Sequence, residues 1–176
     1  GNPAKVIALL QPWLEPTERE IGRRSTLAAM LAGTLAAALF VHDSPQQALE
    51  TLADRLDVIE RGGMPDSIIL AYRTLAEVAL RRGEEARSLE ILVALRELSI
   101  VRALPRLQLG SLAEQVRLHA TCGRVQSAAE LLTEIAAMRP VFAQPIYRAL
   151  APHFERRLAL ATAYVRESGR EGRTSR

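Results

Sequence analysis

Three copies of one short pattern decide the fold of this chain: HDSPQQALETL at 42–52, RGEEARSLEIL at 82–92 and CGRVQSAAELL at 122–132. The second residue of each copy is a turn residue, which is followed after five positions by a small residue and four positions later by a leucine. The nine residues are Asp43, Gly83, Gly123, Ala48, Ser88, Ala128, Leu52, Leu92 and Leu132. A unit that recurs every forty residues and cannot bury its apolar face alone is typical of stacked helical hairpins.

The composition also favours an all-α fold. Hydrophobic residues make up 48% of the 176 residues, but aromatic residues only 4%. A β-sandwich or barrel would need more aromatic and β-branched residues. The uncharged stretch 27–41 is shorter than the roughly 20 residues that span a bilayer, so we interpret it as a buried helix. The lone Cys122 can form no disulfide within the chain and indicates a reducing compartment.

Turn residues and prolines divide the chain into about eight expected helices. Pro16 is expected to end the first helix, and Thr17 with Glu20 resembles a capping box for the second. Ser44 and Asp66 are expected N-caps, and Gly83 and Gly123 are expected left-handed helix ends. The expected helices cover 4–14, 17–41, 45–61, 66–82, 84–99, 106–121, 125–138 and 146–167.

These helices predict a tetratricopeptide-like, right-handed superhelix of antiparallel helix pairs. The second to seventh helices form three pairs, and each pair buries its leucine and alanine stripe on the next. We expect one helical-repeat domain over 1–176, a fragment of a larger protein, with a flexible tail at 168–176. The arginines near the C-terminus are interpreted as a solvated surface and a linker: Arg156, Arg157, Arg170, Arg173 and Arg176.

The stretches LADRLDVIERGGMPDSIILAYRTLAEVALRRGEEARSLEIL (52–92) and LPRLQLGSLAEQVRLHATCGR (104–124) resemble the helical repeats of LuxR-family, MalT-like ATP-dependent transcriptional regulators. The resemblance covers roughly residues 10–138. It implies a parent protein in which a P-loop ATPase domain precedes the repeats and a helix-turn-helix domain follows them. It also implies that the repeats sense a small inducer or a regulatory protein and control ATP-dependent assembly.

The chain carries no motif for catalysis or for nucleotide binding. It has no G-x-x-x-x-G-K-[ST] motif, so we expect ATP only in the ATPase domain of the parent. The three histidines, His42, His119 and His153, are too dispersed to form a metal site. We therefore expect a non-enzymatic segment without cofactor or metal.

The candidate binding residues follow from the repeat. In a tetratricopeptide-like stack the first helix of each pair lines the concave groove. That rule predicts nine groove positions: Gly33, Ala37, Phe40, Arg73, Glu77, Leu80, Ala113, Arg117 and Ala120. The alternative is a solvated face on which Arg73, Glu77 and Arg81 form weak ion pairs. If the groove binds an anionic or polar effector, the expected contacts are Arg73, Glu77, Arg117, Tyr72, Phe40 and, more weakly, Gln108.

Two functions remain open at this point. The first is the effector-sensing or protein-interaction segment of a bacterial LuxR-family regulator, in which ligand binding shifts the parent toward its assembled state. The second is a general scaffold that binds a peptide or partner helix in its groove. We expect a cytoplasmic protein whose partners are a small-molecule effector or regulatory protein and other domains of the same regulator. We expect no direct contact with nucleic acid or membrane, and a homo-oligomer is possible.

Overall fold

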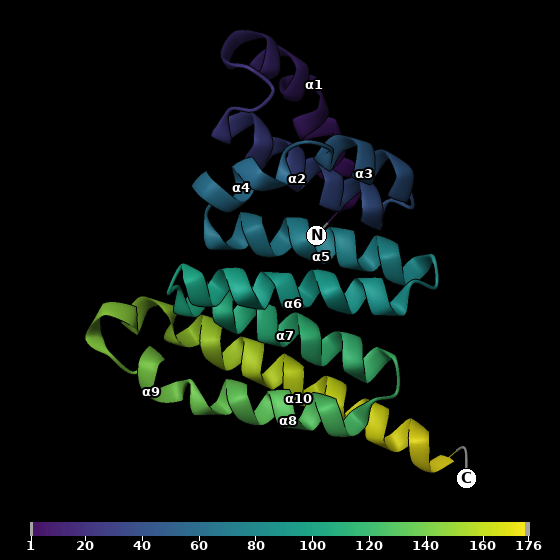
Figure 1. Ribbon diagram of the computed structural model, residues 1–176, viewed down its shortest axis with the longest axis vertical. Helices are drawn as coiled ribbons and strands as arrows, with labels where there is room; N and C mark the ends of the chain where they lie inside the picture. The colour runs from purple at the N-terminus through teal and green to yellow at the C-terminus, as the bar shows by residue number, and fades with distance from the viewer. Residues whose placement is uncertain (1, 175–176) are drawn as a thin grey trace. The chain divides into compact units, whose positions relative to one another are not determined.

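The computed structural model describes the backbone of residues 2–174 and the side chains of residues 2–170, and this part of the chain is all-helical without strands. Figure 1 shows the helices in chain order. The elements are α1 (Pro3–Ile21), α2 (Thr26–Val41), α3 (Pro45–Leu52), α4 (Leu56–Gly62), α5 (Pro65–Arg81), α6 (Glu85–Val101), α7 (Pro105–Thr121), α8 (Val125–Ala137), α9 (Arg139–Phe142), the 3-10 helix η1 (Pro145–Leu150) and α10 (Ala151–Thr174). The predicted all-α helical-repeat class is confirmed.

The chain forms two compact units, Gly1–Ile91 and Leu92–Arg176. In the first unit α2 is the central helix, and α1, α3, α4 and α5 all pack against it. Figure 1 shows α1 on one side of the layer that contains α2 to α4 and α5 on the other. Alanines on α2 allow this close packing, and a Cβ at Gly33 would meet Ile59 Cδ1 at 3.4 Å. The uncharged stretch 27–41 is therefore the core helix of the first unit.

The second unit is built on α7, which packs against α8 and α10. Its aromatic centre is a stacked pair, Phe142 on α9 and Phe154 on α10, with ring centroids 4.9 Å apart. Polar residues of α7 are buried with partners: the Gln115 amide donates to the Leu92 carbonyl at 3.2 Å. Glu114 accepts from Arg117 Nε at 2.9 Å and lies 3.5 Å from Arg157 Nη1 on α10.

The forty-residue repeat is visible in the backbone of the three turns. Asp43, Gly83 and Gly123 all have left-handed φ angles, of 66°, 76° and 71°. The residue after each of these three turn residues donates its N–H to the carbonyl five residues earlier, at 2.9, 3.0 and 2.8 Å. This is the Schellman pattern of a helix end. The predicted left-handed ends at Gly83 and Gly123 are correct. The three small residues that follow the turn residues, Ala48, Ser88 and Ala128, are buried.

The predicted break at Pro16 is wrong, and so is the capping box at Thr17. Helix α1 runs from Pro3 to Ile21 with Pro12 and Pro16 inside it. Both prolines are exposed, so water can satisfy the carbonyls that lose an intrahelical N–H partner. The chain breaks instead at Gly22, whose φ of 90° suits glycine, and Ser25 caps α2 by accepting from the Ala28 N–H.

The expected helix 45–61 is two helices, which is a second correction. The chain leaves helical geometry between α3 and α4, where Asp54 has a φ of 60°. Two arginines from the α1–α2 loop satisfy the carbonyls freed at this break. Arg24 Nη1 donates to the Asp54 carbonyl at 2.5 Å, and Arg23 Nη2 donates to the Ala53 carbonyl at 3.4 Å. The break therefore depends on residues about thirty positions earlier in the chain.

Smaller differences concern helix starts and the C-terminal segment. Met64, not Asp66, is the N-cap of α5, with Pro65 in the first turn, and the Ser44 side chain makes no capping hydrogen bond. The expected helix 146–167 is η1 followed by α10. Helical backbone continues to Thr174, through most of the segment expected to be a flexible tail. The side chains of Arg173 and Arg176 lie outside the described residues.

Candidate functional site

An open groove lies in the first unit, between α1, α2 and α3. Its volume is about 400 Å³. Helix α2 forms the floor with Leu35 and Leu39, while α1 and α3 form the two walls, because both pack on α2. The remaining lining residues are Gln11, Leu14, Glu15, Glu18, Arg23, Gln47, Glu50, Thr51 and Arg55. Volumes of several hundred Å³ are typical of ligand sites in proteins.

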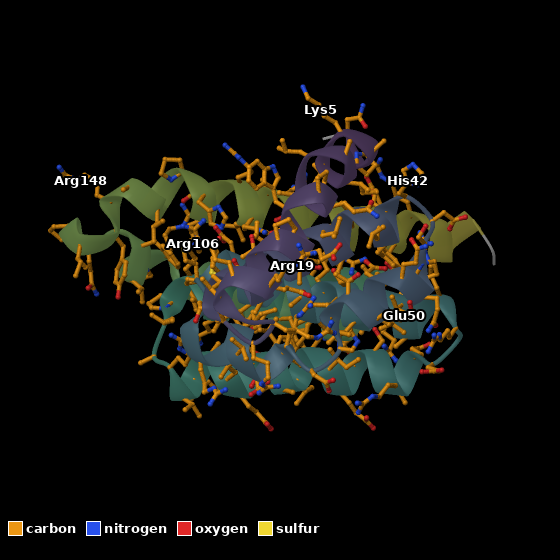
Figure 2. All side chains as sticks on the ribbon, turned by 90° about the horizontal axis from the view of Figure 1, so that it is seen from above. Lys5, Arg19, His42, Glu50, Arg106 and Arg148 are labelled. Atoms are coloured by element: carbon orange, nitrogen blue, oxygen red, sulfur yellow. The ribbon has the colours of Figure 1, made fainter. Side chains whose placement is uncertain are left out.

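A second hollow of about 340 Å³ lengthens this groove. It shares Gln11, Leu39 and Gln47 with the first hollow, and it extends along the N-terminal half of α1 past Ile7 to His42. Figure 2 views this face with α1 in front: Lys5 marks the start of α1, and His42 and Glu50 lie to one side of it. The two hollows together form an elongated groove, which we call the α1–α3 groove.

The walls of the α1–α3 groove are polar. Glu15 on α1 accepts from Arg19 at 2.6 Å, and Glu50 on α3 accepts from the Gln46 amide at 3.0 Å. All four side chains are exposed, so these contacts contribute little stability and can exchange with other partners. The groove therefore combines an apolar floor with carboxylate and amide walls.

Arg55 forms the wall at one end of the groove and is buried there, with only 1% of its surface exposed. Its guanidinium donates to the Thr51 carbonyl through Nη1 at 2.6 Å and to the Glu18 carboxylate through Nη2. Burial lowers the pKa of Arg55, although a guanidinium remains charged at neutral pH. The Nε–H of Arg55 is buried and has no acceptor among the described residues. A buried donor without a partner costs about 1–3 kcal/mol.

Arg55 occupies a position that is aliphatic in the other two repeats. Forty and eighty residues later stand Leu95 and Ile135, and both are fully buried. An arginine in a leucine position brings a desolvation cost of several kcal/mol, which its partner Glu18 only partly offsets. Helix α3 is also interrupted just before Arg55, whereas α6 and α8 continue through the equivalent residues. The first repeat thus departs from the others at the wall of the groove.

The predicted site residues of the first unit lie on α2 and α5, and none of them lines the α1–α3 groove. Phe40 is buried at the end of α2, with the Arg81 guanidinium 4.2 Å from its ring centroid. Tyr72 is buried on α5, and its hydroxyl donates to Glu60 at 2.7 Å. Burial and this hydrogen bond raise the pKa of Tyr72 above its usual range. Arg73, the next residue on α5, is exposed, and Glu77 is half-buried.

The predicted site residues of the second unit are Arg117 and Gln108 on α7. Arg117 is half-buried and donates to the buried carboxylate of Glu114, so it has a packing role inside that unit. Gln108 is half-buried in the first turns of α7, and its carbonyl accepts from Ser111. Of the nine predicted groove positions, Gly33, Ala113 and Ala120 are buried, while Ala37 and Leu80 are half-buried.

Sequence reasoning missed the α1–α3 groove because α1 was expected to end before Pro16. Glu18 lines the groove from the part of α1 that continues past that proline. One signal was present: in the repeat alignment, Arg55 is a charged residue in register with Leu95 and Ile135. A charge at an aliphatic core position indicates a local specialisation of that repeat.

Comparisons with family models, curated proteins and solved structures found no match to this chain. No group of three or more potential metal ligands is present among the described residues. None of the helices in the described part is long and apolar enough to cross a membrane.

Proposed function

We propose that this chain is a binding module and that the α1–α3 groove is its binding site. The observation that carries the proposal is Arg55, a buried arginine with an unpaired Nε–H in the groove wall, at a position that is aliphatic in the other repeats. Functional sites commonly contain a buried polar group although its burial lowers the stability of the fold. Leu35 and Leu39 offer apolar contacts on the floor, and the polar walls offer groups that fix the orientation of a ligand.

The cellular setting we propose is the one that the resemblance implies. The chain would be the effector-sensing or protein-interaction segment of a LuxR-family, MalT-like transcriptional regulator, without catalytic activity of its own. Ligand binding would shift the parent protein toward its assembled state, provided that this state binds the ligand more tightly than the resting state does. An all-α repeat with one specialised repeat supports this role. A reading frame without an adjoining P-loop ATPase and helix-turn-helix domain would contradict it.

A thermal-shift screen with a blocked groove tests the binding site. A bulky maleimide attached at Gln47→Cys, in a Cys122→Ser background, fills the groove, because Gln47 is exposed and lines both hollows. Gln126→Cys, on α8 and outside the groove, carries the same label as a control. Small metabolites and short peptides are screened on both labelled chains.

Ligands of the groove are expected to raise the melting temperature of the Gln126→Cys chain and to have no effect on the blocked chain. A ligand at 100 times its Kd stabilises by about 2.7 kcal/mol, which such a screen detects. A ligand that stabilises both chains equally, and that loses its effect in Arg73→Ala or Arg117→Ala, would instead locate the site on the surface predicted from the repeat. That result would overturn the assignment of the α1–α3 groove.

A further inference from the structure

The charges of the α1–α3 groove are unequal. Three carboxylates line it, Glu15, Glu18 and Glu50, against two guanidiniums, Arg23 and Arg55. Glu18 and Arg55 neutralise each other within the wall. Glu15 on α1 and Glu50 on α3 remain on the two walls, and their present partners, Arg19 and Gln46, are exposed and exchangeable. A cationic group between the two walls would meet both carboxylates.

The shape and the amide groups of the groove suit an extended chain. Its two hollows are continuous through Gln11 and Gln47, which contribute a side-chain amide from each wall. A side-chain amide both donates and accepts, as each peptide unit of a backbone does. The floor of Leu35 and Leu39 offers apolar contact for side chains that point downward. A compact ligand would use only part of this length.

The unpaired Nε–H of Arg55 adds a specific requirement. It is a donor without an acceptor, on a side chain that lines the groove. A carbonyl oxygen is the acceptor that this donor lacks, and pairing it would remove the cost of an unsatisfied buried group. A peptide backbone supplies carbonyl oxygens at regular spacing along its length.

From these observations we infer that the α1–α3 groove binds an extended peptide segment of a partner protein that carries a basic side chain. The basic side chain lies between Glu15 and Glu50, and a backbone carbonyl of the segment accepts from Arg55. This inference rests on the proposed function, because it names the ligand class of the same groove.

Pools of acetylated and amidated pentapeptides test the inference on the full 176-residue chain. Each pool has a fixed central residue, which is lysine, alanine or glutamate, and equal mixtures at the other positions. Affinity is measured by fluorescence anisotropy of labelled pools at low and at moderate salt. The lysine pool is expected to bind about tenfold more tightly than the glutamate pool at low salt, with the difference reduced by added salt.

Two equivalent glutamates provide a matched pair of variants. Glu50 on α3 and Glu130 on α8 stand eighty residues apart in the repeat, and each accepts from a glutamine four residues earlier at 3.0 Å. Only Glu50 lines the groove. Glu50→Gln is expected to reduce the affinity for the lysine pool to about that for the alanine pool, and Glu130→Gln to leave it unchanged. Arg55→Leu with Glu18→Gln removes the donor without leaving an unpaired carboxylate in the groove. This double variant is expected to weaken all pools by a similar factor, with the helical circular dichroism retained.

The outcomes separate this inference from the proposed function. Equal binding of all pools, weakened by Arg55→Leu with Glu18→Gln, would overturn the basic specificity and leave the groove as a peptide site. Binding of free L-arginine, abolished by the label at Gln47→Cys, with no binding of any pool would overturn the peptide class and leave the groove as a ligand site. A preference for the lysine pool that Glu50→Gln does not change would overturn the placement of the charge. Binding of every probe to the blocked chain would overturn both proposals.

Discussion

At the residue scale, the three turn residues of the repeat adopt the same left-handed backbone conformation although they are not the same residue type. Gly83 and Gly123 adopt the left-handed conformation without a Cβ, whereas Asp43 adopts it with one. For an L-residue with a Cβ this conformation costs roughly 1–2 kcal/mol, and aspartate is among the residues that tolerate it best. Arg81 at the end of α5 donates to the Asp43 carboxylate at 2.8 Å, which gives the aspartate a partner that glycine would lack.

Gly83→Ala is therefore expected to lower the free energy of unfolding by about 1 kcal/mol. The cost comes from the backbone alone, because a Cβ at Gly83 meets no atom within 4 Å. Gly169→Ala is the control: this glycine lies inside α10 with equally open surroundings, so alanine there should increase helix stability. Urea unfolding followed by circular dichroism measures both. A stabilising effect of Gly83→Ala would show that the left-handed turn is not required.

The raised pKa of Tyr72 predicts how the free energy of unfolding depends on pH. Its pKa is raised in the folded chain by burial and by the hydrogen bond to Glu60, whereas an unfolded tyrosine ionises at about pH 10. The folded state thus retains a proton that the unfolded state releases, so this stabilisation is complete below pH 10 and is lost as the pH rises further. Unfolding measured between pH 8 and 11 should show a steep decrease. The decrease should be smaller in Tyr72→Phe, and an unchanged profile would contradict the assignment.

Arg55→Leu tests whether the buried arginine is retained for function. Leucine restores the residue type found at the equivalent Leu95 and removes the unpaired donor. Glu18→Gln accompanies it, because the half-buried carboxylate of Glu18 would otherwise lose its partner. For this double variant the unfolding free energy should stay unchanged or rise by about 1 kcal/mol. Leu95→Ala serves as the reference for removing a buried aliphatic side chain, and it is expected to lower the unfolding free energy by about 2–5 kcal/mol. A loss of that size for the double variant would mean that the ion pair of Arg55 and Glu18 holds the first unit together.

At the scale of elements, α1 is held differently from the other long helices. None of its residues is fully buried, and Leu9 and Trp13 are 63% and 64% exposed. Its described tertiary bonds include the ion pair from Glu18 to Arg55, and its two prolines each remove one backbone hydrogen bond. A helix with little buried surface and missing hydrogen bonds belongs to the least stable part of a structure.

Pro12→Ala with Pro16→Ala is expected to stabilise α1 by restoring two backbone N–H donors and the helix propensity of alanine. Both positions are exposed, so the substitution removes no buried contact. Hydrogen exchange should show slower exchange of the α1 amides, and the amides of α7 serve as the control. Unchanged exchange in α1 would indicate that contacts with α2, and not the prolines, determine its opening.

The forty-residue period correctly predicted the helices that follow local rules. The ends at Gly83 and Gly123 and the extents of α7 and α8 depend on residues within each turn, so the sequence carried enough information for them. The break before Arg55 could not be predicted in this way. The backbone carbonyls freed at this break accept hydrogen bonds from Arg23 and Arg24. Such long-range partners leave no periodic pattern in the sequence. The groove depends on that break and on the continuation of α1, and none of its lining residues was among the predicted groove positions.

At the scale of the whole molecule, the chain combines two units with different cores. Small residues of α2 fill the centre of the first, while Phe142 and Phe154 stack in the second. The candidate groove lies entirely within the first unit, and the buried carboxylate of Glu114 lies entirely within the second. The candidate groove and the polar core network are therefore features of separate units.

Phe154→Ala is expected to destabilise the second unit by about 3–5 kcal/mol, because the ring is buried and stacked. If the units unfold separately, hydrogen exchange will accelerate in α7, α8 and α10 more than in α2. Ile59→Ala in the first unit is the reciprocal variant, with the opposite pattern. Equal acceleration in both units for both variants would show that the chain unfolds as one cooperative body.

The position of Trp13 has an optical consequence. It is the only tryptophan of the chain, and it lies exposed on α1, on the helix that forms one wall of the groove. Intrinsic tryptophan fluorescence of the unlabelled protein thus comes from α1 alone. Its emission maximum and its quenching by acrylamide follow the environment of that helix directly, without an engineered probe.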